Sequence, residues 1–516
     1  MSNSNRPESQ SYFTPHYRGA GVLLSVTSLP SPYGIGDFGS GARDWIDRLQ
    51  EAGQSWWQVL PLGPTGYGSS PYQPLSSFAV NWLLISPADL IVDGLLLEPD
   101  LPSMTFTTST VEFDAVCVFK QKLLVTVWIH FQERAKADLK HAFEKFCQEE
   151  QSWLEDYALF QALRDRYNAA CFLDWPTELV RRDPAALTQM RLELAKEMDQ
   201  VCLSQFLVFR QLKCLKEYAH ARGVRLIGDL PFFVSADSSD VWANPELFLL
   251  DDNLRPRFVA GVPPDYFSAE GQFWGNPVYD WDAIRKTGYR WCIDRICALL
   301  EHVDLIRLDH FRGFAAAWQI PDGAPNALAG QWVSGPGSEF FSAVQNELGM
   351  LPLIAEDLGI ITPDVCELRD EFQLPGTRVL QFAFDGSPDN PYLPVNYVSN
   401  TVVFTGTHDN NTTRGWYESL TEDERKVVCE FLHCSLLKSQ EVTAVLLQRA
   451  WSSVAALAMA PLQDVLNLGA NARMNVPGRA EGNWRWRCTA DMLVDPAFEW
   501  LRDLTEKTNR LPMLPQ

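Results

Sequence analysis

Eight short apolar runs recur along this chain, and each is separated from the next by enough residues to form a helix. The first two runs, residues 20–26 and 55–62, flank a segment around residues 41–52 that has a helical pattern. Strand, helix and strand in this order form a βαβ unit, whose two strands pair in parallel. The remaining runs are residues 224–231, 303–308, 353–355, 379–384, 402–406 and 460–467. Eight such strands predict an α/β fold of the (β/α)8 type, the TIM barrel.

Three long stretches interrupt this alternation. Residues 63–222, approximately, are mainly helical in pattern, residues 235–280 are rich in Pro, Gly and aromatic residues, and residues 312–350 form a smaller interruption. We interpret them as insertions into a single barrel over residues 19–516, because no repeats or Pro/Ser-rich linkers divide the chain. The polar residues 1–18 are expected to form a flexible N-terminal segment. No C-terminal β-domain is expected, since the chain ends soon after the eighth run.

The composition restricts the partners and the compartment that we expect. A net charge of −22 repels polyanions, so neither a nucleic acid nor an anionic membrane is an expected partner. No apolar run approaches ~18 residues, and residues 1–18 lack the apolar stretch of a signal peptide. The 11 cysteines have neither zinc-finger nor redox spacing, which favours free thiols in a reducing compartment. We therefore expect a cytoplasmic protein.

Three carboxylates lie where predicted strands end and loops begin. They are Asp309 in RLDHFRGF, Glu356 in AEDLG and Asp409 in THDN. The carboxyl ends of parallel barrel strands meet at one mouth, where the active sites of such barrels lie. Two carboxylates beside one bond are what the cleavage of a glycosidic bond requires. The pattern therefore favours a sugar-processing enzyme, although each carboxylate alone would also fit an ion pair, a helix N-terminus or a turn.

The residues around Asp309 suit a nucleophile. Arg307 lies two residues earlier, so the two side chains share one face of the strand. The positive charge of Arg307 stabilises the ionised carboxylate that attack on an anomeric carbon requires. Asp229, in GDLP at the end of the third run, either binds a sugar hydroxyl or holds Arg307, and the second role is slightly favoured.

Glu356 and Asp409 fit two other roles in the same chemistry. Glu356 is expected to be the general acid/base, with its pKa raised by apolar surroundings and nearby negative charge. Asp409 and the preceding His408 are expected to hydrogen-bond sugar hydroxyls, through bonds that strengthen in the transition state.

Aromatic residues occur in Gly- and Pro-rich segments, where exposed, shaped loops are expected. Tyr72 lies in PTGYGSSPYQ, and Tyr266, Phe267 and Trp274 lie in PPDYFSAEGQFWGNP. On loops near a barrel mouth, aromatic rings can form a stacking platform or a lid for a sugar. Packing that anchors the loops is the alternative for about half of them.

Seven motifs follow one another along the chain: SWWQVLPLGPTGYGSSPYQ, GDLPFFVSADSSDVW, GVPPDYFSAEGQFWGNPVYDW, RLDHFRGF, AEDLG, GTHDNNT and NARMNVPG. In this order they resemble glycoside hydrolase family 77, the 4-α-glucanotransferases known as amylomaltases or disproportionating enzymes. The resemblance covers about residues 19–512. It implies a barrel similar to that of α-amylases but without their C-terminal β-domain, and no metal or organic cofactor. Motifs for phosphate loops and common metal sites are absent from the sequence as well.

The resemblance also implies roles for individual residues. Asp309 is implied as nucleophile, Glu356 as acid/base and Asp409 as transition-state stabiliser. The implied substrate-binding residues are Arg307, His408, Asp229, Tyr72, Tyr266, Phe267, Trp274 and Asn475. The implied partners are α-1,4-glucans, such as maltooligosaccharides and glycogen-derived dextrins, with glucose as an acceptor.

The expected reaction transfers a segment of an α-1,4-glucan to the 4-OH of glucose or of another glucan, with retention of configuration. Retention requires the two catalytic carboxyls to lie about 5–5.5 Å apart. Two alternatives stay open at this point. One is a hydrolase of α-glucans on the same barrel, and the other is a glucan-binding protein with a disabled site, against which the presence of all three acids argues.

Overall fold

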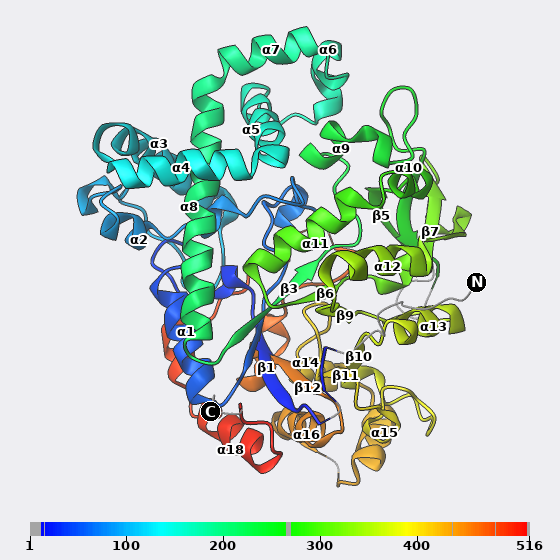
Figure 1. Ribbon diagram of the computed structural model, residues 1–516. Helices are drawn as coiled ribbons and strands as arrows, with labels where there is room; N and C mark the ends of the chain where they lie inside the picture. The colour runs from blue at the N-terminus through cyan, green and yellow to red at the C-terminus, as the bar shows by residue number, and fades with distance from the viewer. Residues whose placement is uncertain (1–11, 15, 265–269, 436, 480, 513–516) are drawn as a thin grey trace.

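Eight parallel strands close into a barrel in the computed structural model, which describes residues 12–14, 16–264, 270–435, 437–479 and 481–512 (Figure 1). Around the barrel the order is β1-β12-β11-β10-β9-β6-β3-β2. The bounds are β1 Gly19–Leu23, β2 Trp56–Gln58, β3 Arg225–Leu230, β6 Leu305–Leu308, β9 Leu353–Ala355, β10 Gly376–Val379, β11 Thr401–Phe404 and β12 Leu457–Pro461. The predicted (β/α)8 barrel is confirmed.

Two strands lie earlier in the chain than predicted. We expected strands at residues 379–384 and 460–467, but β10 and β12 end at the start of these runs. A 3-10 turn, η9 Leu380–Phe382, follows β10, and a short helix, α17 Leu462–Val465, follows β12. In both places the apolar character continues from the strand into the helical turn, so hydrophobicity alone does not mark the change.

Helices alternate with most barrel strands, and the first shows why its residues are helical. In α1 Ser40–Glu51 the buried residues Ala42, Trp45, Ile46 and Leu49 recur with the three- and four-residue spacing of one helix face. The other barrel helices are α8 Ala195–His220, α11 Arg290–His302, α12 Gly337–Leu348, α13 Pro363–Glu371, α14 Thr413–Ser419, α15 Glu422–Leu432, α16 Ser439–Ser452 and α18 Ala497–Lys507.

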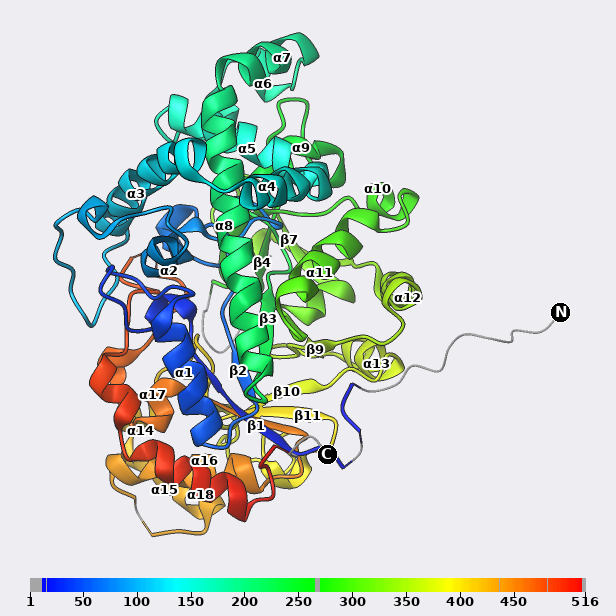
Figure 2. The same ribbon diagram turned by 60° about the vertical axis from the view of Figure 1, so that its left-hand side comes forward.

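A helical region between β2 and β3 rises above the barrel (Figures 1 and 2). It contains α2 Pro87–Val92, α3 Phe113–Arg134, α4 Ala137–Glu149, α5 Gln151–Arg166, α6 Thr177–Val180 and α7 Pro184–Glu193. Helix α8 extends from this region to the barrel, where it packs beside α1 (Figure 2). None of the helices in the described residues has the length and hydrophobicity needed to cross a bilayer.

A second, antiparallel sheet lies beside the barrel and was not predicted. Its strands, in spatial order, are β5 Gln272–Pro277, β4 Phe258–Val262, β7 Ala316–Pro321 and β8 Gln331–Ser334. They come from the two stretches at residues 235–280 and 312–350; the first also contains α9 Ser239–Ala243 and is followed by α10 Trp281–Lys286. The sheet joins segments that lie far apart in the sequence, so no local pattern reveals the pairing. It positions Trp274 on β5.

The described part of the N-terminal segment packs against the barrel. Phe13 is buried, and its ring stacks on Tyr17 with 4.9 Å between centroids. The Tyr17 hydroxyl accepts a hydrogen bond of 2.6 Å from Nε1 of Trp56 on β2. Residues 12–14 and 16–18 are therefore anchored, in contrast to the flexible segment that we expected there.

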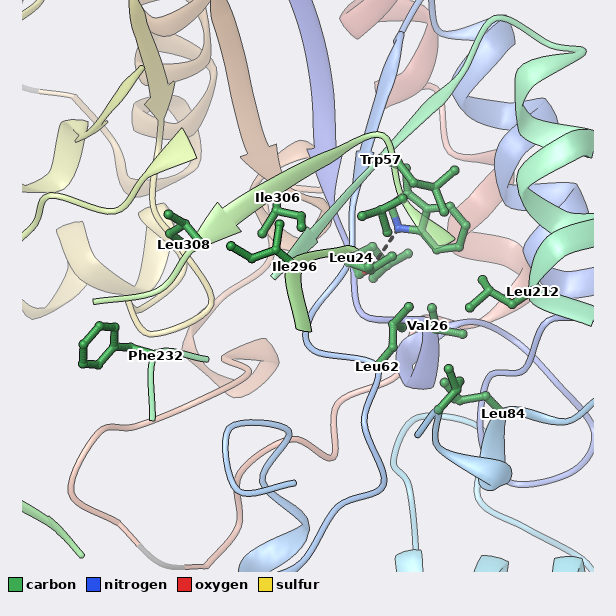
Figure 3. Close-up of a cluster of buried hydrophobic side chains, with 14 of the residues drawn as sticks. Leu24, Val26, Trp57, Leu62, Leu84, Leu212, Phe232, Ile296, Ile306 and Leu308 are labelled. Atoms are coloured by element: carbon green, nitrogen blue, oxygen red, sulfur yellow. Dashed lines mark hydrogen bonds between the residues drawn. The ribbon is translucent and has the colours of Figure 1, made fainter. Parts of the chain in front are cut away.

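The largest core cluster lies between the barrel and its surrounding helices (Figure 3). Trp57 of β2 is fully buried in it, beside Leu24 and Leu62. Its Nε1 donates a 2.8 Å hydrogen bond to the carbonyl oxygen of Leu24, and its ring meets that of Trp45 on α1 edge to face. This side chain thus joins β2 to the helix layer.

Replacing Trp57 by Ala should lower the free energy of unfolding by about 3–5 kcal/mol, because the change leaves a large cavity in the core. Urea unfolding followed by circular dichroism measures the loss. Trp500→Ala on α18 is the control, since Trp500 is 40% exposed, and it should cost less than about 0.5 kcal/mol. Equal losses in the two variants would contradict the role of Trp57 in the core.

Candidate active site

Four barrel strands carry candidate residues to one mouth of the barrel. Asp229 lies on β3 and Arg307 on β6, and the two residues are paired directly across the sheet. Asp309 comes directly after β6, and Glu356 comes directly after β9. His408 follows four residues after the end of β11. Parallel pairing of β3, β6 and β9 therefore brings residues from three distant parts of the chain together.

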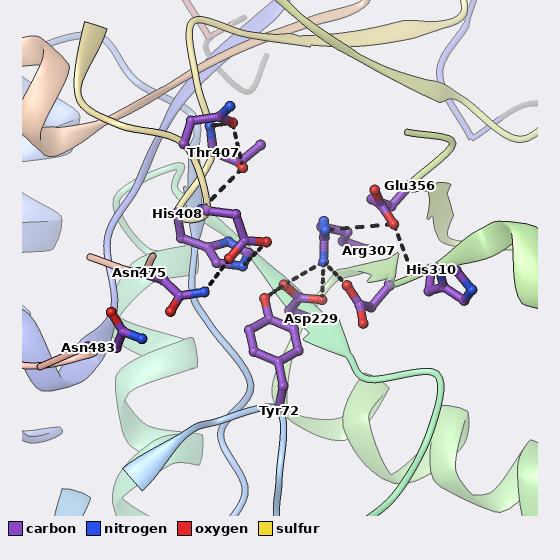
Figure 4. A network of polar contacts seen from close by, with 12 residues as sticks. Tyr72, Asp229, Arg307, His310, Glu356, Thr407, His408, Asn475 and Asn483 are labelled. Atoms are coloured by element: carbon purple, nitrogen blue, oxygen red, sulfur yellow. Dashed lines mark hydrogen bonds and ion pairs between the residues drawn. The ribbon is translucent and has the colours of Figure 1, made fainter. Parts of the chain in front are cut away.

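The buried guanidinium of Arg307 joins the carboxylates of three strands (Figure 4). Its Nη1 donates to both carboxylate oxygens of Asp229, at 2.8 and 2.9 Å, and to Oδ1 of Asp309 at 3.0 Å. Its Nη2 lies 4.0 Å from Oε2 of Glu356. The carboxylates here are paired with an arginine, and the described residues contain no group of three or more His, Cys, Asp or Glu placed to hold a metal ion.

Asp229 is held on two sides. Besides Arg307, it accepts a 2.7 Å hydrogen bond from the hydroxyl of Tyr72. Burial raises the pKa of Tyr72 well above its ordinary value, so this hydroxyl keeps its proton and donates. Burial also raises the pKa of Asp229, and the positive charge of Arg307 opposes that rise. The Asp229 side chain is fully buried, which favours the role of holding Arg307 over contact with a sugar.

Glu356 occupies an environment that favours its protonated form. Burial raises its pKa well above the ordinary value of a glutamate, while Arg307 opposes the rise and Asp309 adds to it. Its Oε2 accepts a 2.7 Å hydrogen bond from the backbone N–H of His310. His310, the donor of this bond, has a φ of 48°, in the left-handed region. A carboxyl group with a raised pKa can donate a proton near neutral pH.

Asp409, unlike Glu356, lies in an environment that favours its ionised form. Partial burial acts to raise its pKa, but the interaction with His408 and the hydrogen bonds from His408 and Asn475 hold the pKa below its ordinary value. Nδ2 of Asn475 donates to Oδ1 at 2.6 Å, and Nε2 of His408 lies 3.2 Å from Oδ2. The Asp409 side chain is 45% exposed, so it presents a negative charge that solvent or a substrate can reach.

Aromatic rings flank both halves of the site. The ring of Tyr72 stacks on that of His408, with 5.2 Å between centroids, and Trp484 lies 5.8 Å from Tyr72. On the Glu356 side, the ring of Trp274 meets that of His310 edge to face at 4.9 Å. Burial lowers the pKa of His310 to about 4, so this ring is neutral at neutral pH. Tyr72 thus contacts the carboxylate of Asp229, and Trp274 packs on His310, whose backbone N–H binds Glu356.

Sequence reasoning did not single out three residues that contribute to this geometry. Besides His310, Nη2 of Arg473 donates to the carbonyl oxygen of Asp409 at 2.6 Å, and Trp484 packs on His408. His310 and Arg473 lie inside the quoted motifs, whereas Trp484 lies outside all of them and carries no signal of its own. The candidates Tyr266 and Phe267 fall outside the described residues.

A parallel barrel with three carboxylates at its mouth, two of them joined by one buried arginine, defines a class of protein. It is the carbohydrate-active (β/α)8 barrel enzyme, because acid pairs in this position serve glycosidic bond chemistry.

Comparisons with known proteins identify the family within this class. The family model for 4-alpha-glucanotransferase, glycoside hydrolase family 77, matches residues 24–492. Over 498 residues the chain is 47% identical to the 4-alpha-glucanotransferase of Synechocystis sp., covering 96% of this chain and 98% of the relative. The chain is also 46% identical over 501 residues to the 4-alpha-glucanotransferase of Thermus thermophilus, covering 96% of this chain and 99% of that relative.

A solved structure agrees with these relatives. The amylomaltase from Streptococcus agalactiae in complex with acarbose matches with a TM-score of 0.92 and 35% identity, covering 96% of this chain and 99% of that one. The chain therefore belongs to glycoside hydrolase family 77, the 4-α-glucanotransferases.

Arg307→Lys should lower the rate of glucan transfer by about 10²–10³-fold, the usual cost of removing a preorganised electrostatic group. A lysine ammonium cannot reproduce the planar guanidinium, whose Nη1 contacts Asp229 and Asp309 while its Nη2 lies 4.0 Å from Glu356. The initial rate on maltotriose measures the effect, at a temperature where circular dichroism shows the variant folded. Arg285→Lys, in an exposed ion pair with Glu339, is the control and should keep the full rate. A wild-type rate in Arg307→Lys would contradict the central position of Arg307.

Proposed function

We propose that this site transfers α-1,4-glucan segments by a retaining double displacement. In the first half, a carboxylate oxygen of Asp309 attacks the anomeric carbon, and the bond from that carbon to the O4 of the departing chain breaks. Glu356 gives its proton to this O4. The products are a shortened glucan and a segment bound covalently to Asp309 in the β configuration.

The second half reverses these steps with a new acceptor. Glu356, now ionised, removes the proton from the 4-OH of glucose or of another glucan. The resulting oxygen attacks the anomeric carbon, the bond to Asp309 breaks, and the α configuration returns. Asp409 is proposed to stabilise the oxocarbenium-like transition state, supported by its exposed charge and its lowered pKa.

The contrast between Asp309 and Glu356 is the observation that carries the proposal. Nη1 of Arg307 donates a 3.0 Å hydrogen bond to Oδ1 of Asp309, so a cation lies beside the proposed nucleophile. Glu356 is buried, and its raised pKa favours a protonated acid. A carboxylate beside a cation and a second carboxyl group with a raised pKa are the two groups that acid-assisted attack on a glycosidic bond uses.

The proposed substrates follow from the family and the site. The relatives named above are 4-α-glucanotransferases, and we propose α-1,4-glucans such as maltooligosaccharides and glycogen-derived dextrins, with glucose as an acceptor. Tyr72 and Trp274 are proposed to contact sugar rings, because their rings pack on His408 and His310, which adjoin Asp409 and Glu356. We also propose a cytoplasmic location, which the 11 free cysteines support.

Incubation with maltotriose tests the transfer reaction. A transferase should produce glucose and a ladder of longer maltooligosaccharides, with little gain in reducing ends. Chromatography resolves the products by length, and a reducing-end assay counts the cleaved bonds. Glucose and maltose with a steady rise in reducing ends would instead show hydrolysis, and proton NMR of the first products distinguishes retention from inversion.

Glu356→Gln should lower the transfer rate by about 10²–10⁴-fold, because the amide cannot donate the proton that the departing O4 needs. Binding of maltoheptaose, measured by calorimetry, should persist because the amide keeps the shape of the side chain. Glu347→Gln, in an exposed ion pair on α12, is the matched control and should keep the wild-type rate. Turnover at the wild-type rate in Glu356→Gln would refute the acid/base assignment.

A further inference from the structure

Strands β9 and β10 meet beside Glu356, and we call their contact the seam. It has the shortest backbone pairing among the barrel strands near the site. β9 and β10 are paired at one position only, Gly376 with Ala355. By comparison, β6 and β9 are paired at three positions, and β10 and β11 at four. Backbone pairing alone therefore joins the strand before Glu356 loosely to its neighbour on this side.

A buried carboxylate strengthens this seam. Asp357, which directly follows Glu356, is only 2% exposed. Its Oδ1 accepts a 2.6 Å hydrogen bond from the backbone N–H of Thr377 on β10. Nη1 of Arg378 lies 3.2 and 3.1 Å from the two carboxylate oxygens, and Nη1 of Arg369 on α13 lies 2.5 Å from Oδ2. One side chain thus joins the end of β9 to β10 and to α13.

The space around this carboxylate is closely fitted. A Cβ atom added at Gly376 would lie 3.0 Å from Oδ2 of Asp357 and 3.1 Å from Nη1 of Arg369. These separations are tighter than ordinary contacts, so even an alanine at position 376 must displace the carboxylate or the arginine. Glycine at the only paired position of the seam therefore leaves room for the cluster.

On its other side, Glu356 is fixed by backbone contacts to the β6 segment. Its N–H donates to the carbonyl oxygen of Leu308 at 3.1 Å, and its own carbonyl oxygen accepts from the N–H of Phe311, also at 3.1 Å. Glu356 therefore sits between backbone bonds to β6 and the side-chain cluster of Asp357. Without the cluster, the β10 side keeps only the bonds of the preceding residue, from the Ala355 N–H to the Pro375 carbonyl oxygen at 2.9 Å and from Oγ1 of Thr377 to the Ala355 carbonyl oxygen at 3.0 Å.

We propose that Asp357 is a positioning residue that holds Glu356 in place for proton transfer. It does so through its bonds to Arg369, Arg378 and the Thr377 N–H. The inference rests on the proposed role of Glu356 as acid/base. Asp357 acts through the backbone and through its charge, and it does not touch the substrate in this role. A displacement of about 1 Å at a reacting group is enough to cost on the order of 100-fold in rate.

The negative charge of Asp357 should also affect the pKa of Glu356, and this effect can be measured separately from the effect on position. The charged and titratable groups around Glu356 are Arg307 and Asp309 from β6, Asp357 itself, Arg378 from β10, Arg369 from α13 and Tyr392. Replacing Asp357 by Asn leaves Arg369 and Arg378 without their shared counter-ion, and their positive charge then favours ionised Glu356. The pKa of Glu356 falls, so activity that needs its proton is lost at a lower pH.

Kinetics of Asp357→Asn test the proposal, with initial transfer rates on maltotriose measured across pH. We expect kcat to fall by about 10–100-fold with KM within about threefold of the wild type, because binding does not depend on the acid. The alkaline limb of the pH profile should move to lower pH. The control is Asp370→Asn, because Asp370 contacts the same Arg369 at 2.7 Å but is 66% exposed, and it should match the wild type.

Gly376→Ala distinguishes the effect of Asp357 on the position of Glu356 from its effect on the pKa of Glu356. It also replaces Asp357→Asn as the test should that variant fail to fold. It crowds the cluster without removing a charge, so kcat should fall while the alkaline limb stays in place. Wild-type kcat and an unchanged pH profile in the folded Asp357→Asn protein would overturn the proposal, as would wild-type kcat in Gly376→Ala. Absence of transfer activity in the wild type would instead refute the proposed function, so the two failures are distinguishable.

Discussion

The buried guanidinium of Arg307 is the interaction on which the rest of the site depends. An arginine removed from water is tolerated only when its charge and its donors are matched, and Asp229, Asp309 and Glu356 provide that match from three strands. The match requires β3, β6 and β9 to be adjacent and in register, which in turn requires a closed barrel. The candidate site is therefore a consequence of barrel closure, and its charges in turn join β3, β6 and β9 at the barrel mouth.

Around this centre, the same residue type performs different tasks because its surroundings differ. Asp229 is fully buried against Arg307 and Tyr72 and acts as a support. Glu356 is buried beside a single backbone donor, so its protonated form is favoured. Asp409 is half-exposed and receives hydrogen bonds that favour its charge. The proposed mechanism uses these different tasks of the acidic residues. The proposed role of Asp357 adds one more, because this acid supports Glu356 from behind and does not contact the substrate.

Much of the fold was predictable because barrel strands are short apolar runs that recur with room for helices between them. All eight strands were anticipated, but β10 and β12 were placed a few residues late, since their apolar character continues into η9 and α17. The four-stranded sheet was not anticipated. Its strands β4 and β7 pair across more than 50 residues of sequence, and such pairing leaves no local pattern to read.

The sequence by itself determined the barrel class, the family and the three acids at the strand ends, because strand periodicity and the order of motifs are local properties of the chain. Only the tertiary structure decided which partners those acids have. The hydrogen bond from Tyr72 to Asp229, the contact of Trp274 with His310 and the cluster around Asp357 all join residues from different elements. Burial and distance shift the pKa of Glu356 upward and that of Asp409 downward, and both are properties of the folded chain as a whole.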